Sequence, residues 1–201
     1  MRREQLEHVI AASAEILETD RFVVIGSQAI HSIHDPPPAM LVSIEVDVYP
    51  ADAPARADEI DAMLGDGSMF HTTFGYYAHG VGPETARAPA GWEERLVPVQ
   101  IQPRSVFRRS PMVLFLERHD LILAKAVASR EHDLAFIQAA MQAHVIDVSD
   151  LMRRVPTLPV NAGQQQRIRD MLHGLHRATQ GARESAVHRP GALRRPNAPE
   201  R

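Results

Sequence analysis

The sequence predicts an α+β fold, with a mixed β-sheet flanked by helices in the first part of the chain and a helical block after it. Short apolar or alternating runs that predict strands lie between helical segments up to residue 116. From residue 117 the apolar residues repeat mainly with helical spacing. A chain of 201 residues with 44% hydrophobic content can bury one sizeable core. We therefore expect one folded unit, made of an α/β core with an N-terminal helix (1–116), a helical block packed on that core (117–180) and a disordered tail (181–201).

The first 50 residues carry the clearest patterns. Apolar residues with helical spacing predict an amphipathic helix over 3–18, and the apolar run 22–25 predicts a short strand. A Gly-Ser pair then leads into a short predicted helix, 28–33, and the prolines of HDPPPA prevent that helix from continuing. Alternation over 42–49 predicts a strand with one face in the core. The core face of this strand would be formed by Val42, Ile44, Val46 and Val48.

The rest of the chain changes from strands to helices. We expect a helix over 53–64, which the turn residues of GDGS end, and strands over 69–79, 96–102 and 112–116. Helices are predicted over 117–130, 131–144, 149–154 and 161–179. The final residues, GARESAVHRPGALRRPNAPER, include few large apolar side chains and many Arg and Pro, which is why we expect the tail to be disordered.

Composition excludes several classes of function. The formal net charge of -3 is mild, so no field of the whole protein pulls it toward nucleic acid or an anionic membrane. Without cysteine, the chain has no disulfides and no thiolate chemistry. The N-terminal residues MRREQLEHVI lack the apolar core of a signal peptide, and no apolar run approaches the roughly 20 residues that span a bilayer. We therefore expect a cytoplasmic location and no membrane partner.

Two carboxylates on the predicted strand 42–49 form the first candidate site. Glu45 and Asp47 are two residues apart, so their side chains point to the same face, with Cα atoms about 6.6 Å apart. Adjacent like charges raise one pKa, and desolvation adds to the cost. A divalent ion removes that cost, and oxygen ligands suit Mg²⁺ or Mn²⁺. The pair therefore predicts a metal site, and the alternative interpretation is a solvated strand face.

Gly26, Ser27 and Lys125 have features of phosphate ligands. A glycine lets the backbone approach a phosphate closely, and Ser27 offers a hydroxyl and an N–H at the start of the predicted helix. Lys125 is the single lysine among 22 Lys and Arg residues, and it lies in the apolar helical segment LILAKAVA. A buried lysine needs an anionic partner. That partner is either a phosphate or Asp47 in the site, or Asp120 or another acidic group in a structural ion pair.

Together these motifs resemble a known signature. A strand, Gly-Ser, a helix and then Glu45-Val46-Asp47-Val48 resembles the nucleotidyltransferase superfamily, in which Gly-[Gly/Ser] is followed by [Asp/Glu]-h-[Asp/Glu]-h, with h an apolar residue. The segments GSQAI, VSIEVDVYP, GWEERLVPV and DLILAKAVASREHD are similar to a little-characterised bacterial branch of it. That branch is related to the nucleotidyltransferase-like toxins of abortive-infection (AbiEii-type) systems. The resemblance covers about residues 22–141.

The resemblance implies a nucleotidyltransferase-like fold and an activity. The protein would move a nucleoside monophosphate from an NTP to an RNA, protein or small-molecule acceptor with Mg²⁺ or Mn²⁺, as a toxin-antitoxin or phage-defence component. Glu45 and Asp47 would be the catalytic and metal-binding residues, and Gly26, Ser27 and Lys125 would bind the nucleotide. The resemblance leaves open whether the protein has a cognate antitoxin as a partner and whether it forms a homodimer.

Two departures from the family pattern bear on catalysis. The gap of 18 positions from Ser27 to Glu45 is longer than usual and contains HDPPPA. Active members generally have a third carboxylate on a later strand, whereas the best candidate strand here, LVPVQIQ, offers Gln100 and Gln102. The alternative function is a non-catalytic nucleotide- or partner-binding protein that keeps the fold.

Overall fold

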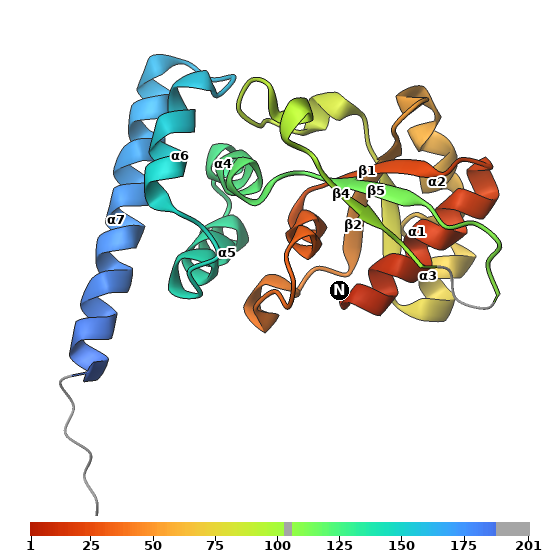
Figure 1. The fold of residues 1–201 in the computed structure, drawn as a ribbon, viewed down its shortest axis with the longest axis horizontal. Helices are drawn as coiled ribbons and strands as arrows, with labels where there is room; N and C mark the ends of the chain where they lie inside the picture. Colours follow the sequence, from red (N-terminus) through yellow and green to blue (C-terminus); the bar gives the residue numbers. More distant parts are fainter. Residues whose placement is uncertain (103–105, 188–201) are drawn as a thin grey trace, which may run out of the picture.

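A single five-stranded mixed sheet forms the centre of the protein (Figure 1). The computed structural model describes residues 1–102 and 106–187, with side chains up to residue 181 outside the internal gap. The order of the strands is β3-β2-β1-β5-β4. Helices flank the sheet and a helical block follows it, which confirms the predicted α+β class.

The pairing of the strands determines which of them can share a site. β1 (Arg21–Ile25) is central and pairs with β2 (Glu45–Pro50) in the antiparallel and with β5 (Met112–Phe115) in the parallel direction. β3 (Tyr77–Gly80) pairs parallel with β2, and β4 (Val97–Gln100) pairs antiparallel with β5. The two edge strands, β3 and β4, are therefore on opposite sides of β1.

The helices form two groups. In Figure 1 the first group, α1 to α3, lies beside the sheet, and the second group, α4 to α7, forms a separate block at the opposite end of the view. The first group comprises α1 (Arg3–Leu17), α2 (Ala57–Leu64) and α3 (Met69–Phe74). The second comprises α4 (Arg118–Ala128), α5 (Glu131–Gln142), α6 (Val148–Arg154) and α7 (Ala162–Val187). No helix in the described part of the chain is both long and apolar enough to cross a bilayer.

Six short 3₁₀ helices complete the connections. They are η1 (Ser27–Ser32), η2 (Pro38–Met40), η3 (Pro54–Arg56), η4 (Pro83–Thr85), η5 (Trp92–Arg95) and η6 (Val155–Thr157). η1 follows β1 directly and packs against α4. Through this contact the helical block reaches the end of the central strand.

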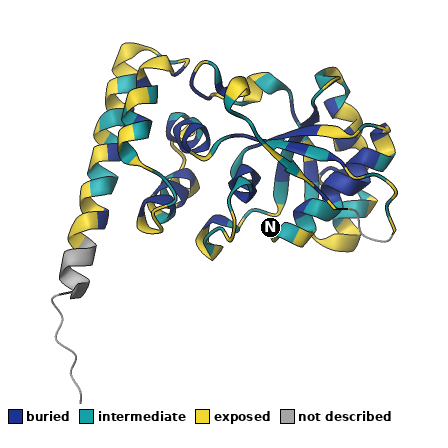
Figure 2. Cartoon of the chain, in the orientation of Figure 1, coloured by how far each residue is buried: buried dark blue, intermediate teal, exposed yellow. Residues whose placement is uncertain are grey.

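One apolar core extends through both groups of helices (Figure 2). Phe22 and Phe115 on neighbouring strands are fully buried, as is Leu6 of α1. Leu121 of α4 and Leu172 of α7 belong to the same buried cluster. Burial at about 25 cal/mol per Å² of apolar surface is the main stabilising term for such a core.

The predicted strand 69–79 is partly wrong. Residues Met69–Phe74 form α3, and only Tyr77–Gly80 is a strand. The Ser68 side chain accepts the N–H of His71 and caps the helix, while Gly75 ends it in the left-handed conformation. Ser before and Gly after a short segment are helix boundary signals, and here they outweigh the β-propensity of the residues between them.

Three other boundaries also differ from the prediction. β2 begins only at Glu45, so Val42 and Ile44 are not on its core face and are 79% and 49% exposed. The predicted helix 28–33 is the 3₁₀ helix Ser27–Ser32. α7 continues to Val187, past its predicted end at Thr179, and the remaining part of the predicted tail, 188–201, lies outside the described residues.

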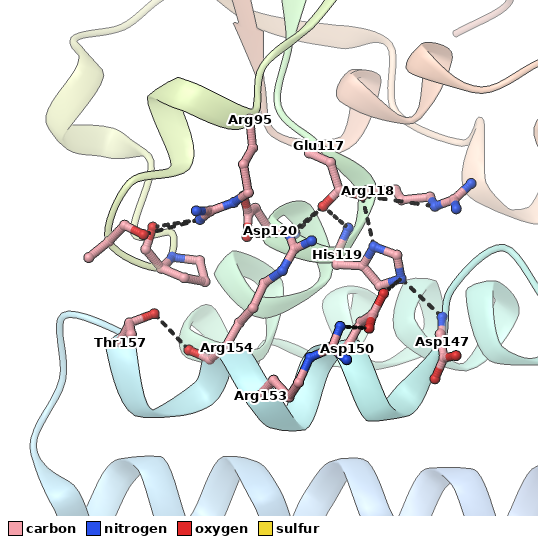
Figure 3. A network of polar contacts seen from close by, with 12 residues as sticks. Arg95, Glu117, Arg118, His119, Asp120, Asp147, Asp150, Arg153, Arg154 and Thr157 are labelled. Atoms are coloured by element: carbon pink, nitrogen blue, oxygen red, sulfur yellow. Dashed lines mark hydrogen bonds and ion pairs between the residues drawn. The ribbon is translucent and has the colours of Figure 1, made fainter.

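A charged network at the start of α4 links the connection before β4 to α6 (Figure 3). The fully buried Asp120 accepts hydrogen bonds from Arg95 Nε (2.7 Å) and Arg154 Nη1 (2.8 Å). Burial opposes ionisation of Glu117, but hydrogen bonds from His119 and Arg154 outweigh it and lower the pKa of Glu117 to about 2. Glu117 is therefore charged, and both carboxylates are paired with arginines.

Replacing Asp120 by Asn removes the buried negative charge that two guanidinium groups share. We expect the free energy of unfolding of Asp120→Asn to fall by about 3 kcal/mol, measured by urea denaturation. Asp52→Asn is the control, because the side chains of Asp52 and its partner Arg21 are 60% and 54% exposed. A solvated pair of this kind contributes less than about 1 kcal/mol. Equal losses in the two variants would contradict the assignment of Asp120 as the stronger link.

Candidate active site

A cleft of about 270 Å³ opens where β1, η1, the start of β2 and α4 meet. Four segments that are far apart in the sequence line it, within residues 25–27, 43–47, 85–87 and 116–133. Among its lining residues are all five site residues predicted from the sequence: Gly26, Ser27, Glu45, Asp47 and Lys125. The fold therefore brings the predicted residues together at one cleft.

Gly26 lies against the carboxylate of Asp47. The antiparallel pairing of β1 and β2 places Ile25 opposite Asp47, so Gly26 follows directly beside it. The Gly26 backbone has φ 63° and ψ -162°, a region that only glycine adopts readily. A Cβ atom at this position would lie 2.0 Å from Asp47 Oδ2. In this structure the space left by the missing side chain is thus taken by the carboxylate of Asp47.

Two side chains from β3 contact the carboxylate pair. In the parallel register Tyr77 is opposite Glu45 and His79 is opposite Asp47. Tyr77 Oη donates a hydrogen bond to Glu45 Oε2 at 2.6 Å. The Nδ1 atom of His79 lies 3.0 Å from Asp47 Oδ1 and 3.9 Å from Glu45 Oε1. The carboxylates are therefore oriented by the neighbouring strand.

The negative charge of this pair has no strong compensation in the described residues. Within that part of the chain neither Glu45 nor Asp47 forms an ion pair with Lys or Arg, and their one ionic partner is His79. Burial, together with the nearby Glu45 charge, raises the pKa of Asp47 to about 6. A cation bound between the two carboxylates would remove this penalty.

The donor set fits a divalent metal ion. One ligand atom from each of Glu45, Asp47 and His79 lies within 4.8 Å of the other two. Two donor atoms on opposite sides of one ion, each about 2.1 Å from it, are about 4.2 Å apart. Small side-chain movements would therefore bring all three donor atoms within bonding distance of one ion. All three side chains are partly exposed, which gives a hydrated ion access.

Lys125 lines the cleft and also has a structural partner. Its Nζ donates to Asp133 Oδ1 at 2.9 Å and lies 4.6 Å from the centre of the Phe136 ring. Burial opposes ionisation of Asp133, but hydrogen bonds from Arg130 and Lys125 outweigh it and keep its pKa below the usual value. Of the partners considered from the sequence, the structure therefore contains an ion pair with another acidic group, Asp133, while Asp120 binds two arginines.

Ser27 and Arg87 also line the cleft, and they differ in how well each could bind an anion. Ser27 is the first residue of η1, which has only six residues and therefore lacks the appreciable dipole that a longer helix would offer an anion. Arg87 is exposed, and within the described part of the chain no ion pair involves it. Arg87 is therefore the lining cation with most freedom to meet an added anion.

His79 was not found by sequence reasoning, and the glutamines that were considered lie elsewhere. Gln100 is on the edge strand β4, across β1 and β5 from β2. The family pattern points to a carboxylate as the third ligand, and the predicted strand 69–79 does not show that the strand begins only at Tyr77. The signal that could have found His79 is the i, i+2 pair Tyr77 and His79 at the end of a strand, which has the same spacing as Glu45 and Asp47.

A larger groove of about 910 Å³ lies in the helical block, between α7 and the turn before α6. Three histidines line it, His144, His173 and His176, together with apolar side chains. Among the residues with described side chains, the group of three whose ligand atoms are close enough to hold one metal ion is Glu45, Asp47 and His79, and it is not in this groove. The smaller cleft is therefore the better candidate for chemistry.

Comparison with known families agrees with the resemblance seen in the sequence. A family model described as "Nucleotidyltransferase of unknown function (DUF6036)" matches residues 4–181. The match includes the sheet, the cleft and most of the helical block. No curated protein and no solved structure matches significantly. The narrower relation to AbiEii-type toxins stays a prediction.

Gly26→Ala should destabilise the protein more than a glycine substitution without a close neighbour. The new Cβ would meet Asp47, and its backbone conformation is strained. We expect a loss of at least about 3 kcal/mol in urea denaturation. Gly75→Ala is the control, because Gly75 also has positive φ, 75°, but nothing lies within 4 Å of its Cβ position. It should lose about 1 kcal/mol, and similar losses in both would contradict the proposed contact.

Asp47→Asn should stabilise the metal-free protein at neutral pH. Because the folded pKa of about 6 exceeds the ordinary 3.8, folded wild type holds a proton that the unfolded chain has lost between these values. Its stability therefore falls as pH rises through this window. We expect Asp47→Asn to be more stable than wild type by about 2 kcal/mol at pH 7 in EDTA, with the difference absent near pH 4.

This pH dependence is measured by urea denaturation of both proteins from about pH 4 to pH 8. The exposed Asp52, which pairs with Arg21, provides the control variant Asp52→Asn. That variant should show no gain in stability at neutral pH. A constant difference between Asp47→Asn and wild type across the range would mean that Asp47 does not carry the raised pKa.

Proposed function

Since the chain belongs to the family of nucleotidyltransferases of unknown function, we propose that it transfers a nucleoside monophosphate from an NTP to an acceptor hydroxyl with the help of a divalent metal ion. The acceptor is an RNA end, a protein side chain or a small molecule. Glu45 and Asp47 would hold the metal, and the Gly26-Ser27 turn with Lys125 would hold the phosphates.

The carboxylate pair without Lys or Arg partners is the observation that carries this proposal. Elsewhere buried carboxylates are compensated, as Asp120 is by Arg95 and Arg154. Glu45 and Asp47 instead face a cleft and have His79 as their one ionic partner among the described residues. The uncompensated pair would therefore favour the binding of an added cation. The metal ion of a metal-bound triphosphate is such a cation.

The charges around the cleft favour a triphosphate in a defined direction. The acidic pair is at the β2 side, whereas Arg87, Lys125 and Arg130 line other parts of the same cleft. Phosphates would therefore extend from the metal toward these cations. A cleft of about 270 Å³ is at the small end for ligand sites, so we expect it to enclose the phosphates and leave the base outside.

Each residue of the site has a defined role in the proposed transfer. Ser27 would donate its hydroxyl or N–H to a phosphate oxygen, and Glu45 and Asp47 would be held in position by Tyr77 and His79. The acceptor oxygen bonds to the α-phosphorus, the bond to pyrophosphate breaks, and the hydroxyl proton is released to water. When bound, the metal would supply charge neutralisation of the phosphates.

The second candidate is a nucleotide- or partner-binding protein that does not catalyse transfer. The donor set favours it, because active members generally have a third carboxylate, whereas the third member of the group in the described residues is His79. A toxin-antitoxin or phage-defence role, a cognate antitoxin and a homodimer also remain proposals from the resemblance. An adjacent gene for a small regulator would support such a role.

The transfer proposal is tested with each α-³²P-labelled NTP, Mg²⁺ or Mn²⁺, and total RNA or lysate. Wild type should transfer label, and metal-NTP should raise its melting temperature, since saturation at 100 times Kd adds about 2.7 kcal/mol. The double variant Glu45→Gln with Asp47→Asn should fold, transfer nothing and gain nothing from metal-NTP, because it lacks both charges.

The matched control is Glu59→Gln with Asp61→Asn, which removes two carboxylates of the same i, i+2 spacing from the exposed side of α2. It should retain both transfer and stabilisation. Stabilisation of wild type without transfer would favour the binding protein. Equal stabilisation of wild type and the Glu45/Asp47 double variant would contradict the site itself.

A further inference from the structure

The pairing of β2 with β3 forms two aligned pairs of side chains, and the β2 member of each pair lines the cleft. Glu45 is opposite Tyr77, and Asp47 is opposite His79. The hydrogen bond from Tyr77 occupies Oε2 of Glu45, while Oε1 is the oxygen that lies 3.9 Å from His79 Nδ1. His79 Nδ1 is thus near an oxygen of each carboxylate, and one ligand atom from each of Glu45, Asp47 and His79 lies within 4.8 Å of the other two.

His79 differs in its surroundings from other histidines that contact carboxylates. The partner of His132, Asp133, is also bound by Lys125 and Arg130. The partner of His119, Glu117, is also bound by Arg154. At both places the cations already satisfy the carboxylate. A third histidine, His71, contacts one carboxylate, that of Asp66, which is 77% exposed to water. His79 contacts two carboxylates that have no Lys or Arg partner in the described chain.

The geometry points to His79 as the third ligand of the metal site, and we infer that this imidazole makes the site prefer Mn²⁺ to Mg²⁺. This inference rests on the proposed function. Mg²⁺ takes oxygen ligands almost exclusively, and it gives up its waters reluctantly. Mn²⁺ is a divalent first-row transition metal ion, and ions of this group accept imidazole nitrogen together with carboxylate oxygen as ligands.

The other interpretation is that His79 only orients Asp47 through their hydrogen bond. The two roles differ in one measurable respect. An orienting histidine keeps its nitrogen away from the ion, so replacing it changes the affinities for both metals by a similar factor. A ligand contributes a nitrogen to the ion, so replacing it by a carboxylate changes the ratio of the two affinities.

The direct test uses the full chain with Mn²⁺ alone, without nucleotide. Electron spin-echo envelope modulation of bound Mn²⁺ should show coupling to an imidazole nitrogen in wild type and lose it in His79→Asp. Free Mn²⁺ measured by electron paramagnetic resonance gives its Kd, and competition gives the Kd for Mg²⁺. We expect the ratio of Mn²⁺ to Mg²⁺ affinity to fall at least about tenfold in His79→Asp.

His173→Asp is the control, because His173 is exposed on α7 and is not part of the donor set. It should keep the nitrogen coupling and the affinity ratio of wild type. Wild type that binds Mn²⁺ without nitrogen coupling overturns the inference, whether or not His79→Asp folds. If that wild type still transfers label, the proposed function stands without this ligand. Wild type that binds neither metal and transfers nothing overturns both.

Discussion

The contact between Gly26 and Asp47 is the constraint on which the site depends. Antiparallel pairing of β1 and β2 brings the turn after the central strand against a carboxylate, and only a residue without a side chain can occupy that position. The same pairing places Ser27 and Glu45 at the cleft. Because the contact is between two adjacent strands of the core sheet, the position of the acidic pair is determined by folding and not by a mobile loop.

The buried acids of the helical block and the half-buried acids of the cleft differ in how their negative charge is compensated. Asp120 and Asp133 each receive two cationic side chains, and these groups link helices of the block to one another and to the connection before β4. Glu45 and Asp47 have no such partners among the described residues, and burial raises the pKa of Asp47. Compensated carboxylates stabilise the folded state, whereas an uncompensated pair lowers stability in return for affinity toward a cation.

Most of the architecture could be predicted from local patterns. The apolar run of β1 and the periodicity of α1 and α4 to α6 gave elements near their observed places, because these segments follow the 2.0 and 3.6 periods clearly. The error at Met69–Phe74 arose because a Ser cap and a terminal Gly outweighed strand propensity. That error also concealed His79, whose partnership with Asp47 depends on the register of two strands some 30 residues apart and is invisible to any local pattern. Lys125 could be identified as partnered, but the choice of Asp133 required tertiary geometry.

β3 is a strand of four residues at the edge of the sheet, paired on one side by β2. The side chain of His79 is 48% exposed, so it contributes little to the core. A substitution there removes a hydrogen bond to Asp47 but leaves the pairing of β1 with β2 and β5 in place. His79, the proposed third metal ligand, could therefore change during evolution with little loss of folding stability. Changes at Gly26 or Asp47 would affect the strands that hold the sheet together. In a family with this fold, we expect diversity of chemistry to arise first at the edge strand.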